Sequence, residues 1–296
     1  MAAAGERLVA VGDRGVIVFS DDRGASWIQA DSVPTQALLT GVCFIDARRG
    51  VAVGHDEVVI TTADGGRTWQ RTHYAPQAQR PLLDVWCGGG QVIAVGAYST
   101  YLTSADGGAS WQETSFRPAP PPAAAHPAQD GTRNDYHLNR IVSADAARLY
   151  IAAEAGHLYR SDDGGRTWMT LASPYAGSFF DVLPLGAQVV LAFGLRGNLY
   201  RSEDAGASWR RLDTHTVELL DGGARLADDA VAIVGLAGVV LVSGDGGRTF
   251  TLQQQAERAG LAAALGVGHL RLAVGGENGA RLLALEAPPA TDGSAR

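Results

Sequence analysis

The sequence predicts an all-β protein, a single seven-bladed β-propeller built from four-stranded antiparallel blades. An octet of the form Ser/Thr-x-Asp-x-Gly-x-Ser/Thr-aromatic occurs six times, and its closing aromatics stand at positions 27, 69, 111, 168, 209 and 250. Successive aromatics are therefore 42, 42, 57, 41 and 41 residues apart. Two strand-like runs with a sharp turn between them precede each octet. A period near 42 residues with this order of strands and turns indicates one propeller blade per repeat.

Each octet is expected to form a hairpin turn. Its Asp accepts hydrogen bonds from the backbone that follows, its leading hydroxyl does the same, and its Gly suits a positive φ. The closing aromatic begins the next strand and covers the turn. One active site needs one or two carboxylates, so six similar Asp residues favour a structural role. These Asp and aromatic residues are Asp22, Trp27, Asp64, Trp69, Asp106, Trp111, Asp163, Trp168, Asp204, Trp209, Asp245 and Phe250.

The strand pattern divides the chain into parts. In the first repeat, residues 8–11 and 16–20 read as strands around the turn Gly12-Asp13-Arg14-Gly15. In most repeats a further apolar run precedes this pair, and a more polar strand follows the octet. We expect one propeller over residues 1–286, a Pro-rich surface insertion at about 115–133, and a disordered tail at 287–296.

The two ends of the propeller should be incomplete. A seventh copy at residues 270–285 has no octet after it, so its blade should lack the fourth strand. The innermost strand of the first blade should be barely present. We therefore expect an upstream segment, and a signal peptide removed with it would place the protein outside the cytoplasm. A native start at Met1 would place it inside.

Composition excludes several classes of partner. The net charge is −7, the pI is near 5.5, and all 24 basic residues are Arg. This acidic balance argues against nucleic acid, and the absence of a long apolar run argues against a membrane span. Cys43 and Cys87 both fall where inner strands are expected. Strands of separate repeats usually lie too far apart for a disulfide, so we expect two buried, unpaired cysteines.

The turns between second and third strands should share one face around the central axis, opposite the octets. Mixed polar side chains that converge there are the only candidate site, although solvated turn residues would explain them equally well. The residues are Asp13, Arg14, His55, Asp56, Glu57, Tyr98, Glu154, His157, Arg196, Asn198, Glu277 and Asn278. No His/Cys spacing indicates a metal, and no phosphate loop or nucleophile elbow occurs. We predict no cofactor, no metal and no catalytic residue.

The octets are similar to Asp-boxes, also called BNR repeats. Residues 39–54 followed by 62–69 resemble the repeat of the photosystem II stability/assembly factor family, with an apolar strand containing Phe44, then Gly50 and Gly54, then the octet. The likeness continues in weaker form over residues 7–285. It implies a non-enzymatic scaffold that binds protein partners, including membrane-protein complexes, and that we expect to be monomeric.

A carbohydrate-active or sugar-binding propeller is the alternative, because sialidases and oligoxyloglucan hydrolases also carry Asp-boxes. The sequence has no Arg-Ile-Pro motif of the sialidase type. The oligoxyloglucan hydrolases resemble two propellers in tandem, for which this chain is too short. Glycoside hydrolysis also needs two carboxylates about 5 to 9.5 Å apart, and the sequence nominates no such pair.

Overall fold

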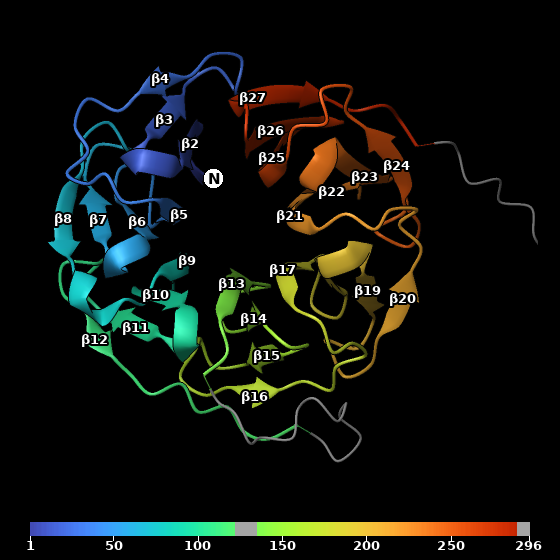
Figure 1. The fold of residues 1–296 in the computed structure, drawn as a ribbon, viewed down its shortest axis with the longest axis horizontal. Helices are drawn as coiled ribbons and strands as arrows, with labels where there is room; N and C mark the ends of the chain where they lie inside the picture. The colour runs from blue at the N-terminus through green and yellow to red at the C-terminus, as the bar shows by residue number, and fades with distance from the viewer. Residues whose placement is uncertain (122–134, 289–296) are drawn as a thin grey trace, which may run out of the picture.

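In a computed structural model, which describes residues 1–121 and 135–288, seven small antiparallel sheets are arranged around a central axis (Figure 1). Each sheet consists of consecutive strands, so the blades follow one another round the ring in chain order. The predicted all-β, seven-bladed propeller is confirmed. Within the described residues the helical segments are all three-residue 3-10 turns.

The strands of the first four blades run from the centre outward in the order of the sequence. They are β1 (Ala2–Ala4), β2 (Arg7–Val11), β3 (Ile17–Ser20) and β4 (Ile28–Gln29); β5 (Leu39–Phe44), β6 (Gly50–Gly54), β7 (Val59–Thr62) and β8 (Gln70–His73); β9 (Leu82–Gly88), β10 (Gln91–Gly96), β11 (Tyr101–Ser104) and β12 (Gln112–Glu113); β13 (Leu138–Ser143), β14 (Leu149–Ala153), β15 (Leu158–Ser161) and β16 (Met169–Thr170).

The remaining three blades follow the same order. They are β17 (Phe179–Pro184), β18 (Val190–Gly194), β19 (Leu199–Ser202) and β20 (Arg210–Leu212); β21 (Leu220–Arg225), β22 (Val231–Gly235), β23 (Val239–Ser243) and β24 (Thr251–Gln254); β25 (Leu261–Gly268), β26 (Arg271–Gly276) and β27 (Gly279–Ala284).

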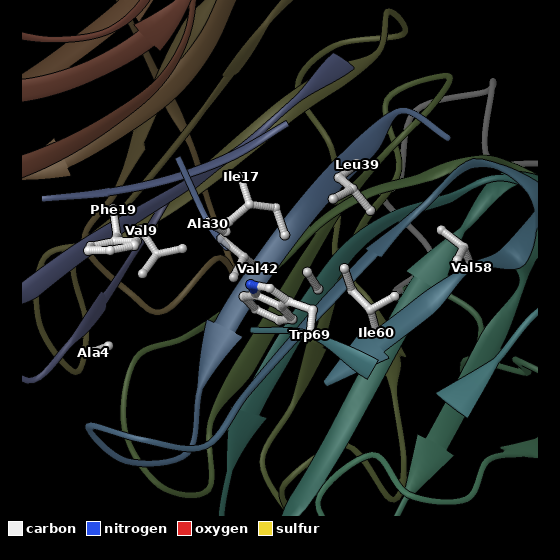
Figure 2. Close-up of a cluster of buried hydrophobic side chains, with 11 residues drawn as sticks. Ala4, Val9, Ile17, Phe19, Ala30, Leu39, Val42, Val58, Ile60 and Trp69 are labelled. Carbon is white, nitrogen blue, oxygen red and sulfur yellow. The ribbon is translucent and has the colours of Figure 1, made fainter. Parts of the chain in front are cut away.

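The core lies between blades rather than within them. Second strands such as β6 and β22 are buried along their whole length, because neighbouring blades cover both faces of each sheet. They are accordingly near-continuous runs of Val, Ile and Ala. Between blades one and two, Val9 and Phe19 of the first sheet and Ile60 and Trp69 of the second belong to one buried cluster (Figure 2). Apolar burial of this kind is the main favourable term in folding.

Blade seven has three strands among the described residues, as predicted, and its outer strand β27 has no partner on one side. Blade one does have an inner strand, since Ala2–Ala4 pairs with β2. Packing joins the two blades: Gly24 of the first octet lies against Ala273 and Leu282, and the Met1 side chain lies against Gly275. Beyond β27, the Glu286 backbone exchanges two hydrogen bonds with the Gln253 side chain of blade six.

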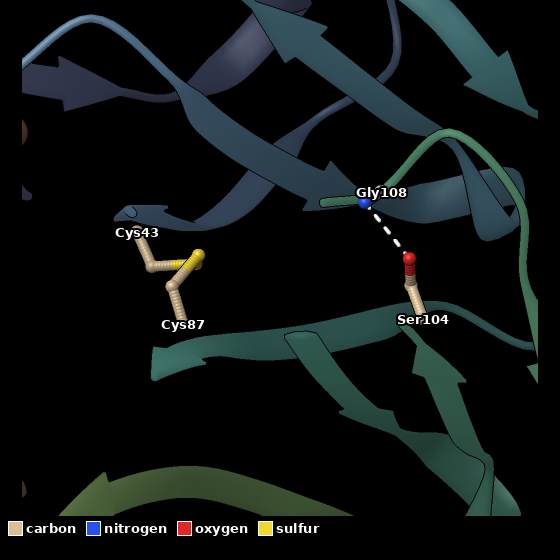
Figure 3. Close-up of a disulfide and its surroundings, with 4 residues drawn as sticks. All are labelled: Cys43, Cys87, Ser104 and Gly108. Atoms are coloured by element: carbon tan, nitrogen blue, oxygen red, sulfur yellow. Dashed lines mark hydrogen bonds between the residues drawn. A yellow bond between two sulfur atoms is a disulfide. The ribbon is translucent and has the colours of Figure 1, made fainter. Parts of the chain in front are cut away.

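The expectation of unpaired cysteines is wrong. Cys43 on β5 and Cys87 on β9 form a disulfide across two blades, with their Cα atoms 5.7 Å apart (Figure 3). The blades are wedge-shaped and their inner strands converge on the axis, which brings the two Cα atoms within bonding reach. The approach is close along these strands, because a Cβ on Gly41 of β5 would lie 2.9 Å from the Cα of Asp84 on β9.

The first part of the Pro-rich insertion packs against the propeller. Ala119 forms a parallel bridge with Met169, and the Phe116 ring stacks on Tyr101 with centroids 5.5 Å apart. The rest of the predicted surface insertion, residues 122–134, lies outside the described residues, as does the predicted tail from residue 289. In the described ranges no helix is long and apolar enough to cross a membrane.

Candidate functional site

The six octets share one hydrogen-bond pattern. In the first, Ser20 Oγ donates to Asp22 Oδ1 at 2.8 Å and accepts from Gly24 N at 2.7 Å, while Ser26 N and Oγ donate to the two Asp22 oxygens. The hydrogen bonds from Ser26 and Ser20 hold the pKa of Asp22 at about 2. The carboxylate is fully used by its own turn, as the sequence predicted. Figure 3 shows the corresponding bond between Ser104 and Gly108 in blade three.

Side chains next to the octets fasten several blades to the following one. Arg7 pairs with Asp21 at 2.6 Å and donates to the carbonyl of Gly65 in the next octet. Arg160 donates to the carbonyl of Ala205 at 2.9 Å in the same manner. We call this side of the ring the octet face: the octets plus the loops that join first to second strands. Its basic side chains are largely consumed by such contacts.

The opposite side consists of the turns between second and third strands together with the linkers that lead into the next blade, and we call it the turn face. Turns and linkers are bonded to each other: Gly15 N donates to Ala37 O, and His55 N donates to Leu38 O. The contact leaves no room for a side chain at Gly54, whose Cβ would lie 2.1 Å from Leu38 O. This contact explains the second glycine of the Gly50-x-x-x-Gly54 spacing, while a Cβ on Gly50 would instead lie 2.6 Å from the Phe44 ring.

The third residue of six of these turns has a positive φ. Arg14 (52°), Asp56 (61°), Tyr98 (54°) and Arg196 (57°) adopt this left-handed conformation, which disfavours residues with a Cβ. Such strain persists where the surrounding structure imposes it, and it is concentrated at functional positions. All four side chains are exposed on the turn face.

Exposed apolar side chains gather on the same face. Eight large hydrophobic residues are exposed in the described chain, and six of them lie in the turns or linkers: Val16, Leu38, Tyr74, Tyr98, Val217 and Leu236. The other two, Ile28 and Met169, lie on outermost strands. Clustering of exposed apolar groups on one side marks an interaction surface.

The structure places the twelve predicted site residues in two groups. Asp13, Arg14, His55, Asp56, Tyr98, Arg196, Glu277 and Asn278 are exposed, and Glu154 is half-buried. Glu57, His157 and Asn198 are buried and cannot meet a partner. The Glu57 carboxylate instead accepts from Arg80 Nε at 2.7 Å, and Asn198 Nδ2 donates to Leu195 O at 2.9 Å. Asn198 therefore holds its own turn, whereas Glu57 joins its turn to Arg80 in the linker that follows.

The linkers supply residues that sequence reasoning missed. Between blades three and four, the Tyr98 ring meets the His137 ring edge-on at 5.0 Å, and His137 Nδ1 lies 3.3 Å from Glu154 Oε1. Below them, Tyr136 stacks on His157 at 3.9 Å. The position of the linkers, which enter the inner strands from the same side as the turns, was the signal that could have found them.

Two grooves mark the turn face. One of about 540 Å³ lies between blades one and two, where the Arg71 guanidinium covers the Tyr74 ring at 4.6 Å, with Val33, Pro34 and Asp56 also in its lining. The other, of about 780 Å³, is lined by residues 211–218 with Leu252 and Gln254. Both volumes lie in the range of ligand sites in proteins.

A charged cluster lies on the innermost strands. Arg140 Nε is 3.5 Å from Asp84 Oδ2 and 3.4 Å from Asp181 Oδ1. Each Asp also accepts a backbone N–H from the next blade, Asp84 from Ile141 and Asp181 from Gly223. Burial raises the pKa of Asp221, on the neighbouring strand, to about 6, and Arg140 opposes this shift. These groups join inner strands to one another. Across the described residues no group of three or more His, Cys, Asp or Glu side chains could hold a metal ion.

The fold and its six octets define a seven-bladed Asp-box β-propeller. The model of the family described as photosynthesis system II assembly factor YCF48 matches residues 19–123 and 82–230. The chain therefore belongs to that family. No curated protein sequence matches it.

Solved structures agree on the fold. YCF48 from Cyanidioschyzon merolae is 17% identical with a TM-score of 0.73, covering 94% of this chain and 90% of that one. A structure titled YCF48 bound to D1 peptide is 16% identical with a TM-score of 0.72, covering 97% and 92%. A glycoside hydrolase of family 74 from Niastella koreensis is 16% identical with a TM-score of 0.60, and the match covers 93% of this chain but 42% of the enzyme.

Proposed function

We propose that this protein is a non-enzymatic assembly scaffold that holds a protein partner on its turn face. The observation that carries the proposal is the segregation of exposed apolar side chains, six of eight on that face. An interface needs apolar anchors surrounded by polar groups, and Tyr and Arg are enriched among the anchors. Tyr98 and Tyr74 supply the aromatic groups, and Arg14 and Arg196 supply cations on the same face.

The two arginines differ in whether their guanidinium groups already have a partner within the protein. Arg14 Nε lies 3.7 Å from Oδ2 of the neighbouring Asp13, and both side chains are largely exposed. The Arg196 side chain forms no ion pair or hydrogen bond with the described residues. A guanidinium with free donors can bind a partner carboxylate bidentately. We therefore infer that acidic groups of the partner meet Arg14 and Arg196.

Family membership supports a peptide or protein as the partner. In one solved member, YCF48 is bound to D1 peptide. The grooves beside Tyr74 and beside Val217 have enough volume to accept peptide side chains. The linkers that form these grooves differ in sequence from blade to blade. A membrane-protein complex is the class of partner that this likeness suggests for our chain.

A sugar-processing role is the alternative, because the glycoside hydrolase of family 74 has a related fold. That enzyme's chain is far longer than this one, as the 42% coverage shows. In the proposed scaffold the octet carboxylates serve their own turns, and the deeply buried Glu57 is bound by Arg80. Neither arrangement leaves a pair of carboxylates to act as acid and nucleophile.

Site-specific photo-crosslinking tests the proposal. A photoreactive phenylalanine analogue is placed at Tyr98 or at Leu236 on the turn face, with Ile28 and Met169 on outer strands as matched controls of similar exposure. We expect Tyr98 and Leu236 to crosslink to one protein in cells of the native organism, and the controls to give no such product. Crosslinking only from Ile28 or Met169 would contradict the turn-face assignment. Cleavage of aryl glycosides by purified protein would contradict the scaffold itself.

A further inference from the structure

On the octet face, the junction between blades five and six lacks one of the contacts that joins blades four and five. Arg7 in blade one and Arg148 in blade four occupy equivalent positions at the start of the second strand. Arg148 pairs with Asp162 at 2.6 Å and donates to Ala187 O at 2.8 Å. Blade five has Val189 at this position. Its short side chain cannot reach across the junction, so the junction between blades five and six lacks the arginine that fills the preceding one.

A cavity of about 190 Å³ occupies this place, and three guanidinium groups line it. They belong to Arg201 on β19, Arg225 at the end of β21 and Arg248 in the sixth octet, while Asp229 is the only carboxylate of the lining. The lining therefore carries three positive charges and one negative charge, and Arg201 NH2 also pairs with the exposed Glu203 carboxylate at 3.0 Å. The volume is below that of a drug-sized site but admits a small ion.

The arginines are held in position with donors left over. Arg201 NH1 donates to Gly246 O at 3.3 Å and Arg248 NH1 donates to Asp245 O at 2.7 Å, so the two guanidinium groups sit on consecutive carbonyls. The Arg201 side chain is 2% exposed, yet its buried Nε has no hydrogen-bond partner. Arg225 is exposed, and its side chain has no hydrogen-bond or ion-pair partner in the described part of the chain. A buried, unpaired donor of a charged group is costly and implies that something accepts from it.

We propose that this cavity binds a phosphate dianion, either inorganic phosphate or the phosphate of a small monoester. The three guanidinium groups outnumber the two carboxylates at the site, Asp229 and Glu203, and the oxygens of a phosphate accept from the fork of donors that each guanidinium presents. The site lies on the octet face, away from the proposed partner surface. It does not depend on the proposed function.

Calorimetric titration of the full-length protein tests the site, with inorganic phosphate and ribose 5-phosphate as separate ligands and sodium chloride at equal ionic strength as the control. We expect saturable binding of inorganic phosphate. Binding of ribose 5-phosphate as well would show that a monoester also fits, and its absence would restrict the site to the free ion. In Arg225→Gln the affinity should fall by at least about tenfold. Val189→Arg, which supplies the side chain found at Arg148, should abolish binding without lowering the melting temperature.

Arg166→Gln is the matched control, because Arg166 has the same octet position as Arg248 in a blade without this cavity. It should bind phosphate like the unmodified protein. Absence of saturable phosphate binding would overturn the proposal. Undiminished binding in both Val189→Arg and Arg225→Gln would also overturn it, because the ion would then bind elsewhere.

Discussion

The two faces of this propeller use the same residue types differently. On the octet face, Asp22 is saturated by its own turn and Arg7 is committed to Asp21 and the next blade. On the turn face, Arg196 extends from a left-handed backbone position, and Tyr98 is 54% exposed. The octet face therefore holds the ring together, whereas the turn face is the surface that we propose for the partner. A substitution should affect stability or binding according to the face on which it lies.

The largest effect is expected from the octet aromatics. Trp168 is 7% exposed, and its Nε1 donates to Gly165 O and Tyr101 Oη, each at 3.2 Å. Trp168→Ala should lower the free energy of unfolding by about 3–5 kcal/mol. Arg166→Ala, on the surface of the same turn, should cost less than about 0.5 kcal/mol. Denaturant titration checks both, and equal midpoints would break the structural account of the octet.

The octet tryptophans differ in whether the indole N–H is hydrogen-bonded. The buried Nε1 of Trp27 has no hydrogen-bond partner, unlike that of Trp168. Trp168→Phe should therefore destabilise the protein by about 1 kcal/mol more than Trp27→Phe, because only the first loses a hydrogen bond. The same denaturant titration measures the difference, and a larger loss at Trp27 would contradict it.

The disulfide should contribute the next largest effect. It closes a loop with a sequence separation of 44 residues, and loops of this size typically stabilise by about 2–4 kcal/mol. The double variant Cys43→Ala, Cys87→Ala should unfold at lower denaturant concentration by that amount. Reductant should lower the midpoint of the unmodified protein and leave that of the variant unchanged. An effect of reductant on the variant would show that another process is being measured.

The centre of the ring should show a smaller, pH-dependent effect. Burial raises the pKa of Asp221 to about 6 from an ordinary 3.8, so the folded state binds its proton more tightly than the unfolded state does. The carboxyl therefore favours folding at low pH, and this contribution is lost as the pH rises from about 4 to about 6. Asp221→Asn should raise the melting temperature by about 2–4 °C at pH 7.5, if the net gain is near 1 kcal/mol, and by less at pH 5. A rise of equal size at both pH values would contradict the assignment.

Most of the fold could be predicted because short sequence patterns, the octets and the strand-like runs, determine each blade. The octets from Ser20 to Phe250 fix six hairpins, and the missing octet after residue 285 predicts the three-stranded seventh blade. The Cys43–Cys87 bond could not be predicted, since it depends on how closely inner strands of two blades converge. Local spacing carries no information on that distance.

The candidate face was predictable only as a set of turns. Glu57 is bound by Arg80, which lies in a linker 23 residues further along the chain. His137 contacts the Tyr98 ring only because of where the fourth blade begins. The cavity beside Val189 is visible only when one junction is compared with another in three dimensions. In each case a contact between blades, rather than a pattern along the chain, decides the role of the residue.

Substitutions of the exposed arginines on the turn face should have the smallest effect on stability and the largest effect on partner binding. Arg14→Glu and Arg196→Glu change exposed side chains, so each should cost less than about 0.5 kcal/mol. Thermal melting checks this. A large loss of stability in either variant would show that the turn face also fastens the ring, and the contrast between the faces would fail.

Partner capture by paired double variants tests the central claim most directly. Protein carrying Arg14→Glu and Arg196→Glu is compared with protein carrying Arg67→Glu and Arg166→Glu, which makes the same charge change on the octet face. Both are first shown to melt like the unmodified protein. We predict that the turn-face variant loses the crosslinked partner while the octet-face control retains it. Retention by the turn-face variant together with loss by the control would place the binding surface on the octet face and contradict the account.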